Sequence, residues 1–238
     1  MIQEIDDKSY DEYDFSTILK NLNTNEQIEK IEQINRTNKE SVDIFIKFLR
    51  NRKYASKEFP NHIDGLVYEI LYKKTCLESQ TFLEKEFSRG ILPLDTTKNI
   101  DYYDLQKLLV EKKFQEADQI TQTKLRQLAD LKNREWLYFT DVQKIPSIDL
   151  NTIDKLWRIH SLDKFGFSIQ RRIWLQFNKD WNALWNNIGW QTNNNPCRYP
   201  NEFVWDVTGP KGHLPLFNQL RGVQVLSALF KHELWKNE

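Results

Sequence analysis

Apolar residues recur three or four positions apart along the first part of the chain, which is the spacing of one face of an α-helix. The predicted amphipathic helices cover residues 15–22, 28–34, 42–49 and 63–71. Polar or proline-containing stretches separate them at residues 23–25, 38–39 and 59–61. Because a helix with a single apolar stripe needs a partner to bury it, this part of the chain is expected to form a small helical bundle.

Residues 90–97 interrupt the helical pattern, since a glycine and a proline within them disfavour helix. We therefore place a domain boundary near residue 98. The predicted organisation is an N-terminal helical bundle over residues 1–98 and a second domain over residues 99–238.

The second domain is also predicted to be helical, which makes the whole chain all-α. An antiparallel helix pair over residues 101–109 and 114–128 opens it, with Asp101 as the N-cap of the first helix. Shorter helices follow, and their predicted N-caps are Asp149 or Asn151, then Ser168, then Asp180. Gly189 is expected to end the third of these, and a last helix to run from about Gln219 to Lys231.

Aromatic residues distinguish the second domain from the first. All eight tryptophans lie after residue 135, beginning with Trp136. Those at helical spacing are predicted core residues: Trp157, Trp174, Trp181 and Trp185. Arg171 and Arg172 are expected to face solvent. Residues 191–217 have no helical period, and a loop this long is usually functional or disordered; its aromatic content favours a functional loop.

Composition excludes several classes of protein. The 34 basic and 34 acidic residues give a net charge of zero, so a general attraction for nucleic acid is absent. Cys76 and Cys197 lie far apart with no metal-binding spacing, which argues against a disulfide framework or a zinc site. No apolar run is long enough to span a membrane, and the acidic N-terminal residues are unlike a signal or transit peptide. We expect a soluble globular protein.

Several segments of the second domain resemble the genomes-uncoupled family of tetrapyrrole-binding proteins. The central matches are Leu150 to Trp157, Phe165 to Gln170, and Ile173-Trp174. Upstream matches are Tyr103, Leu105, Leu108, Leu109, Phe114 and residues 116–118, and downstream matches are Gly189-Trp190 and Pro210 to Pro215. The matches occur in order over most of the second domain, and family members in cyanobacteria and plastids also carry a helical bundle ahead of it.

The resemblance implies a non-catalytic regulator of chlorophyll biosynthesis. Family members bind protoporphyrin IX and magnesium protoporphyrin IX, associate with the porphyrin-binding large subunit of magnesium chelatase, and stimulate magnesium insertion. It also implies a photosynthetic host, and peripheral membrane association is a further expectation. The bias toward Asn, Lys and Ile favours the plastid (chloroplast) stroma of an alga over a cyanobacterial cytoplasm.

A porphyrin is a flat apolar disc with two propionates on one edge, so its receptor needs a wide apolar slot and a polar rim. Tyr199, Phe203 and Trp205 on the long loop are the predicted slot residues. Further porphyrin-binding positions are predicted at Phe139, Val142, Phe167, Trp190 and Leu214. Core packing is the alternative role for most of these side chains.

The predicted rim is Asn218 and Arg221, which match positions in the ligand-binding region of the family and suit carboxylates chemically. A surface ion pair is the alternative role for Arg221. His213 is also assigned to the site, either as an axial ligand to a metal or as a hydrogen-bonding brace for its loop; we favour the brace. No metal site of the protein itself is predicted.

Catalytic signatures such as a nucleophile elbow, a zinc-binding helix or a phosphate-binding loop are missing from the sequence. We therefore predict no enzyme and no catalytic cofactor. Two other functions remain open: a helical protein-interaction scaffold without ligand, and a haem-handling enzyme. Quenching of tryptophan fluorescence by an added porphyrin distinguishes the porphyrin carrier from the scaffold.

Overall fold

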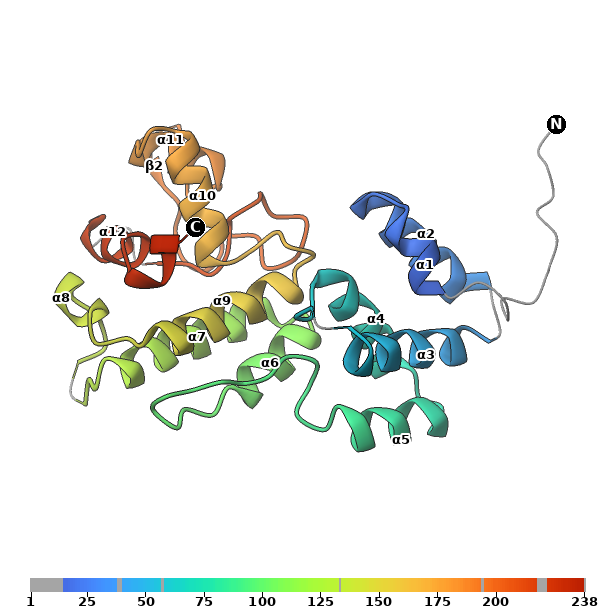
Figure 1. The fold of residues 1–238 in the computed structure, drawn as a ribbon. Coiled ribbons are helices and arrows are strands. Elements are labelled where there is room, and N and C mark those ends of the chain that lie inside the picture. Colours follow the sequence, from blue (N-terminus) through green and yellow to red (C-terminus); the bar gives the residue numbers. More distant parts are fainter. Residues whose placement is uncertain are drawn as a thin grey trace. The chain divides into compact units, whose positions relative to one another are not determined.

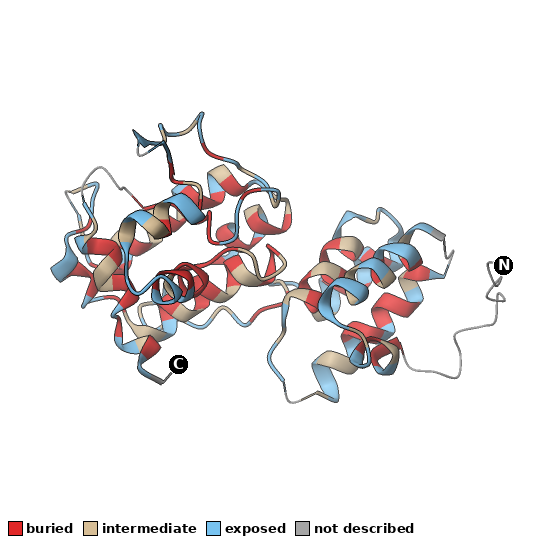
Figure 2. Cartoon of the chain, turned by 90° about the horizontal axis from the view of Figure 1, so that it is seen from above, coloured by how far each residue is buried: buried red, intermediate tan, exposed pale blue. Residues whose placement is uncertain are grey.

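The computed structural model describes residues 15–37, 40–56, 58–132, 134–193, 195–217 and 222–237. Its helices follow one another with only a two-stranded antiparallel hairpin between them, so the predicted all-α fold is confirmed. The chain divides into two compact units, one ending at Ser88 and the other beginning at Arg89. Each unit has its own buried core, shown in red in Figure 2.

The first unit consists of short antiparallel helices (Figure 1). They are α1 (Phe15–Lys20), α2 (Thr24–Thr37), α3 (Ser41–Tyr54), α4 (His62–Lys73) and α5 (Leu77–Glu86). Apolar side chains at the predicted helical spacing form the core, including Ile31, Phe45, Leu49, Val67 and Leu71. The stripes therefore pack against each other as the pattern predicts.

The start of α4 shows how this unit is closed by local chemistry. The Asn61 side chain accepts hydrogen bonds from the backbone of Ile63 and Asp64, and Asp64 returns one to the backbone of Asn61. Arg52 on α3 donates to both oxygens of Asp64, at 2.8 and 2.9 Å. A bidentate pair of this kind fixes α3 and α4 in one register.

The second unit contains two groups of helices (Figure 1). The first group is α6 (Tyr103–Val110), α7 (Phe114–Leu128), α8 (Phe139–Val142) and α9 (Ser147–Ile159). The second is α10 (Phe167–Gln176), α11 (Trp181–Asn187), α12 (Gln224–Phe230) and the 3-10 helix η2 (Glu233–Asn237). Between α11 and α12 the strands β1 (Gln191–Thr192) and β2 (Asn195–Pro196) form a short hairpin.

Aromatic stacking holds α7 to α9. The rings of Phe114 and Trp157 stack with their centroids 5.9 Å apart, and Phe165 meets Phe114 edge-on at 5.6 Å. The Trp157 indole nitrogen donates to the Thr121 hydroxyl at 3.0 Å, so its one polar group is satisfied inside the core. Trp174 is likewise buried and lies 4.9 Å from Trp181 between ring centroids. These contacts confirm the predicted core role of Trp157 and Trp174, whereas Trp181 and Trp185 are half-buried.

Residues 90–98 belong to the second unit rather than linking two domains, so the structural division lies ten residues before the expected boundary near 98. The cause is Asp149, whose buried carboxylate accepts hydrogen bonds from both Thr96 and Thr97. This carboxylate was expected to cap α9, but α9 begins two residues earlier at Ser147. A side chain that looked local therefore makes a long-range contact.

Three more local predictions need correction. Ser168 does not cap α10, because the helix begins at Phe167 and Ser168 instead donates to the Asp154 carboxylate. Arg171 is half-buried and donates to the Phe230 carbonyl at 2.9 Å, so only Arg172 faces solvent as expected. The last helix begins at Gln224 rather than near residue 219.

Two other helix ends agree with the sequence. Asp180 caps α11 by accepting from the Ala183 nitrogen at 3.0 Å, and Gly189 follows the helix with a φ of +71° that an L-residue rarely adopts. Across the described residues, no helix combines the length and the apolar character needed to cross a membrane.

Candidate functional site

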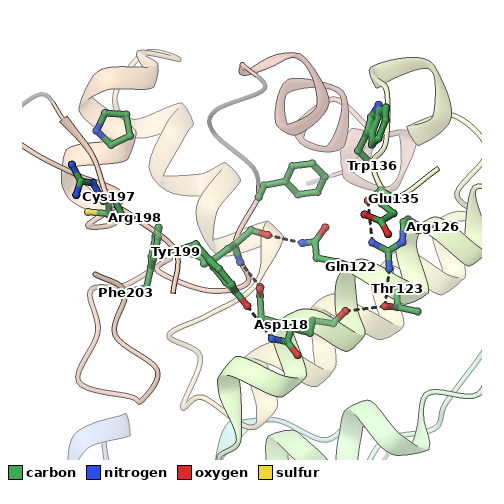
Figure 3. A pocket seen from close by; sticks show the side chains of 14 residues that line it. Asp118, Gln122, Thr123, Arg126, Glu135, Trp136, Cys197, Arg198, Tyr199 and Phe203 are labelled. Carbon is green, nitrogen blue, oxygen red and sulfur yellow. Dashed lines mark hydrogen bonds between the residues drawn. The ribbon is translucent and has the colours of Figure 1, made fainter. Parts of the chain in front are cut away.

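A cavity of about 910 Å³ lies in the second unit between α7 and the loop that follows β2 (Figure 3). One wall is the polar side of α7, since the opposite side of this amphipathic helix packs into the core through residues such as Phe114 and Leu125. The α7 side chains that line the cavity are Asp118, Gln119, Gln122, Thr123 and Arg126. The helix thus presents hydrogen-bonding groups to the cavity at successive turns.

The facing wall is mainly apolar. It consists of Tyr199 and Phe203 on the long loop together with Leu216 and Phe217, and Trp136 adds an aromatic ring at the end near Arg126. Tyr199 and Trp136 are 51% and 38% exposed, so these two rings are open to a ligand, whereas Phe203 is 8% exposed. The cavity therefore combines a hydrogen-bonding wall with an aromatic one, which is typical of small-molecule sites.

Two α7 side chains hold the peptide group of Leu216. The Asp118 carboxylate accepts from the Leu216 nitrogen at 2.7 Å, and the Gln122 amide donates to the Leu216 carbonyl at 2.6 Å. Burial raises the pKa of Asp118 to about 7, although the hydrogen bond from Leu216 acts in the opposite direction. The floor of the cavity thus contains a carboxyl group that titrates near neutral pH.

We expect Asp118→Asn to stabilise the protein at pH 8, with a melting temperature about 5 °C above that of the natural chain. A carboxyl whose pKa rises on folding contributes to stability below the pKa of the unfolded chain, about 3.9, and that contribution is lost as the pH rises through about 7. Asparagine keeps the acceptor oxygen and cannot ionise. Thermal unfolding followed by circular dichroism at pH 4 and pH 8 tests this, with the exposed Asp104→Asn as the control. Equal melting temperatures at pH 8 would contradict it.

The exposed ring of Tyr199 reaches back to α7. Its hydroxyl accepts from the Gln119 amide at 3.1 Å, and its ring meets Trp205 edge-on at 5.7 Å. Trp205 donates to the Pro200 carbonyl at 3.0 Å, which fixes the turn between them. The loop is therefore held by specific contacts on both sides of the tyrosine.

Arg126 brings a positive charge to the aromatic end of the cavity. Its guanidinium donates to the Glu135 carbonyl and to the Thr123 hydroxyl, each at 3.0 Å. Both acceptors are uncharged, and within the part of the chain that the structure describes no carboxylate forms an ion pair with it. A cation in this setting is suited to an anionic ligand group.

Two family models match the chain. One, described as GUN4-like, covers residues 95–233, and the other, described as an ARM-like repeat domain, GUN4-N terminal, covers residues 4–88. The chain belongs to the GUN4-like family. The resemblance inferred from the sequence is therefore confirmed, and residues 89–238 are called the GUN4-like unit below.

Relatives and solved structures agree with the family. The ycf53 protein of the red alga Pyropia yezoensis is 49% identical over 224 residues, which cover 92% of this chain and 93% of that protein. The tetrapyrrole-binding protein, chloroplastic, of Arabidopsis thaliana is 36% identical over 139 residues, 54% of this chain and 52% of that protein. The structure of GUN4 from Chlamydomonas reinhardtii matches with a TM-score of 0.57 and 36% identity, covering 61% of this chain and 97% of that one.

His213 lies behind the wall of the cavity in the GUN4-like unit. Its Nδ1 lies 2.6 Å from the Ile188 carbonyl and its Nε2 accepts from the Val204 nitrogen at 3.0 Å, so the hydrogen-bond network assigns the proton to Nδ1. Burial lowers the pKa of this imidazole, which favours the neutral form. Both nitrogens are used to brace the loop, as the favoured alternative predicts. In the described segments, no group of three or more His, Cys, Asp or Glu residues could hold a metal ion.

The remaining predicted site residues are distributed over three environments. Phe167, Trp190 and Leu214 are fully buried and do not line the main cavity. Phe139 and Val142 line a smaller cavity of about 400 Å³ beside α12. The other two predicted positions, Asn218 and Arg221, lie outside the described residues. Tyr199 and Phe203 are thus the predicted residues that the structure brings to the main cavity, and Trp205 supports them from behind.

Sequence reasoning missed the α7 wall of the site. Asp118 and Gln122 look like ordinary solvent-facing positions of an amphipathic helix, and the Leu216 peptide that they bind is nearly a hundred residues away in the chain. A buried acid in the middle of a helix was the one available signal, since Asp118 is adjacent to Ala117 on the apolar side. Burial of that acid depends on the loop, which has no period to predict its path.

Proposed function

We propose that the GUN4-like unit binds protoporphyrin IX or magnesium protoporphyrin IX in the cavity between α7 and the aromatic loop, and that the protein acts as a regulator and not as an enzyme. The carrying observation is the combination of an aromatic wall with an anion-binding guanidinium in one cavity. A relative named as a tetrapyrrole-binding protein supports the choice of ligand.

The size and chemistry of the cavity fit this ligand class. Its volume of about 910 Å³ lies within the range of small-molecule sites, about 300–1,000 Å³. Covering roughly 250 Å² of macrocycle at about 25 cal/mol per Å² provides on the order of 6 kcal/mol before ordering costs. Offset stacking on Tyr199 or Trp136 adds to this, so micromolar affinity is expected.

The acidic groups of the ligand match the one cation fixed beside the aromatic end. Arg126 is held by a carbonyl and a hydroxyl, so a propionate can bind it without displacing a competing carboxylate. A guanidinium binds a carboxylate through two parallel hydrogen bonds, which orients the disc as well as attracting it. Asn218 and Arg221 stay predicted rim residues.

A cradle for the macrocycle, rather than a metal centre, is the mode of binding that the side chains favour. His213 uses both ring nitrogens within the fold, so it has no lone pair to offer a central magnesium. Metal-free protoporphyrin and its magnesium complex then make the same contacts with the protein. Such a site accepts both the substrate and the product of a chelatase.

The regulatory role places the protein beside magnesium chelatase. We propose that the porphyrin-loaded chain associates with the large subunit of that enzyme and stimulates magnesium insertion in the plastid stroma. The red algal relative and the chloroplastic Arabidopsis relative support a plastid location. In a reconstituted chelatase assay the full chain is expected to increase the rate of magnesium insertion, and an unchanged rate would contradict the regulatory role.

A porphyrin titration tests ligand binding directly. Adding deuteroporphyrin IX to the full chain is expected to quench tryptophan fluorescence with saturation at a stoichiometry near one, because Trp136 and Trp205 lie at or just behind the cavity. The same titration with the magnesium complex is expected to give an affinity within about tenfold, since no protein ligand to the metal is involved. Failure of both to quench would reject the proposal and favour a ligand-free scaffold.

A further inference from the structure

The wall of the cavity that ends in Leu216 and Phe217 is held by a single turn of α7. Asp118 and Gln122 are four residues apart, so their side chains project from the same face of the helix. One accepts from the Leu216 nitrogen and the other donates to its carbonyl, so both polar groups of one residue are bound from one helix. Leu216 and Phe217 themselves line the cavity.

This arrangement fixes the width of the cavity. The apolar side chains of Leu216 and Phe217 face the space that a ligand would fill, and their backbone has no helix or strand to hold it. Two hydrogen bonds to a long rigid helix replace that missing secondary structure. Loss of either bond would let the wall move relative to α7.

The Asp118 carboxyl is also part of the cavity surface, although only 3% of the residue is exposed. Other titratable or charged groups lining the cavity are Arg126 on α7, Glu135 after it, and Cys197, Arg198 and Tyr199 on the loop. None of them forms a hydrogen bond with Asp118 in the structure, whose one recorded partner is the Leu216 nitrogen. An ionised Asp118 therefore has a single peptide N–H to stabilise its charge.

We propose that Asp118 and Gln122 are positioning residues for the bound tetrapyrrole, which hold the Leu216–Phe217 wall against α7, and that binding favours the protonated form of Asp118. This inference rests on the proposed porphyrin site. An apolar disc that covers the cavity floor removes the remaining water from the carboxyl, which disfavours its charged form. The ligand propionates are anions and act in the same direction. Binding therefore takes up a proton, and affinity decreases as the pH rises through about 7.

The test is a deuteroporphyrin IX titration of the full chain between pH 6 and pH 8.5. The dissociation constant of the natural chain is expected to increase about tenfold across this range, as linkage to one proton allows. Asp118→Asn is expected to bind with little dependence on pH, because its amide keeps the acceptor for Leu216 and does not ionise. A purely structural role for Asp118 would leave the pH profile of this variant unchanged.

Gln122→Met tests the other half of the clamp. Methionine has a similar length but donates no hydrogen bond, so binding is expected to weaken about fivefold at every pH, the effect of one lost hydrogen bond. The matched control is Gln127→Met, an exposed glutamine on the same helix that does not line the cavity. Circular dichroism of each variant confirms that α7 stays folded.

The outcomes separate this inference from the proposed function. If the natural chain fails to bind deuteroporphyrin, the porphyrin site itself is rejected. If the natural chain binds but Asp118→Asn keeps its pH profile, or Gln122→Met binds as tightly as Gln127→Met, only the positioning role is overturned. A flat profile for Asp118→Asn together with weaker binding by Gln122→Met supports it.

Discussion

Replacing Asp149 with alanine is expected to destabilise the GUN4-like unit by about 4 kcal/mol, the range observed when a buried hydrogen-bonded charge is removed. The carboxylate is fully buried and accepts from the Thr96 hydroxyl at 2.5 Å, the Thr97 nitrogen at 3.0 Å, the Thr97 hydroxyl at 2.7 Å and the Tyr102 hydroxyl at 2.7 Å. Alanine would leave these donors buried without an acceptor, and each such donor costs about 1–3 kcal/mol.

The titration behaviour of Asp149 supports the same conclusion. Burial acts to raise its pKa, but the hydrogen bonds from Thr96, Thr97 and Tyr102 outweigh burial and hold the pKa below its ordinary value. A carboxyl whose pKa is lowered on folding contributes stability above the pKa of the unfolded chain, and this contribution is lost as the pH falls through the lower folded value. The destabilisation by Asp149→Ala is therefore expected to be full at pH 7.

Denaturant unfolding of the full chain measures this effect. The transition of the GUN4-like unit should shift to lower denaturant concentration, whereas the exposed carboxylate variant Asp104→Ala should leave it in place. Asp149→Asn retains one acceptor oxygen and is expected to fall between the two. A change below about 1 kcal/mol in Asp149→Ala would mean that the threonine donors find water or other partners.

Sequence patterns predict the helices of this protein because the information for a helix is local. The stripe that includes Phe114 on α7 and the one that includes Trp157 on α9 both appear at the expected spacing, and the two rings stack in the structure. The same is true of the Asp180 cap, which binds a nitrogen only three residues away. Where the partner of a side chain lies within one turn, the sequence is sufficient.

Contacts between distant segments were beyond the sequence patterns. Asp149 was expected to act within its own helix, yet its partners lie 47 to 53 residues away, and Asp118 binds a nitrogen 98 residues away. An aspartate at a helix start and one in a helix interior give no sign of such partners in the sequence. Tyr199 was found because a loop without a helical period had no structural reason to carry an aromatic residue there. The aromatic half of the cavity was therefore predicted and the polar half was not.

Removing the two exposed aromatic rings of the cavity should cause the largest loss of ligand affinity. The double variant Tyr199→Ala and Trp136→Ala is expected to bind porphyrin about a hundredfold more weakly, since two lost aromatic contacts together correspond to about 3 kcal/mol. Both rings are substantially exposed, so their removal costs the fold little beyond the Gln119 hydrogen bond and the edge contact with Trp205. The loss would thus report on ligand contact and not on unfolding.

The measurement must not depend on the tryptophan that is removed, so the shift of the porphyrin absorption band on binding replaces fluorescence quenching. A matched control removes two other exposed rings of the same unit, Tyr103 and Phe177, which are 40% and 38% exposed and do not line the cavity. This control is expected to bind like the natural chain. If the cavity variant also bound within about threefold of it, the porphyrin would have to lie elsewhere, because stacking on the only two open rings of this cavity's described lining would then contribute less than about 1 kcal/mol.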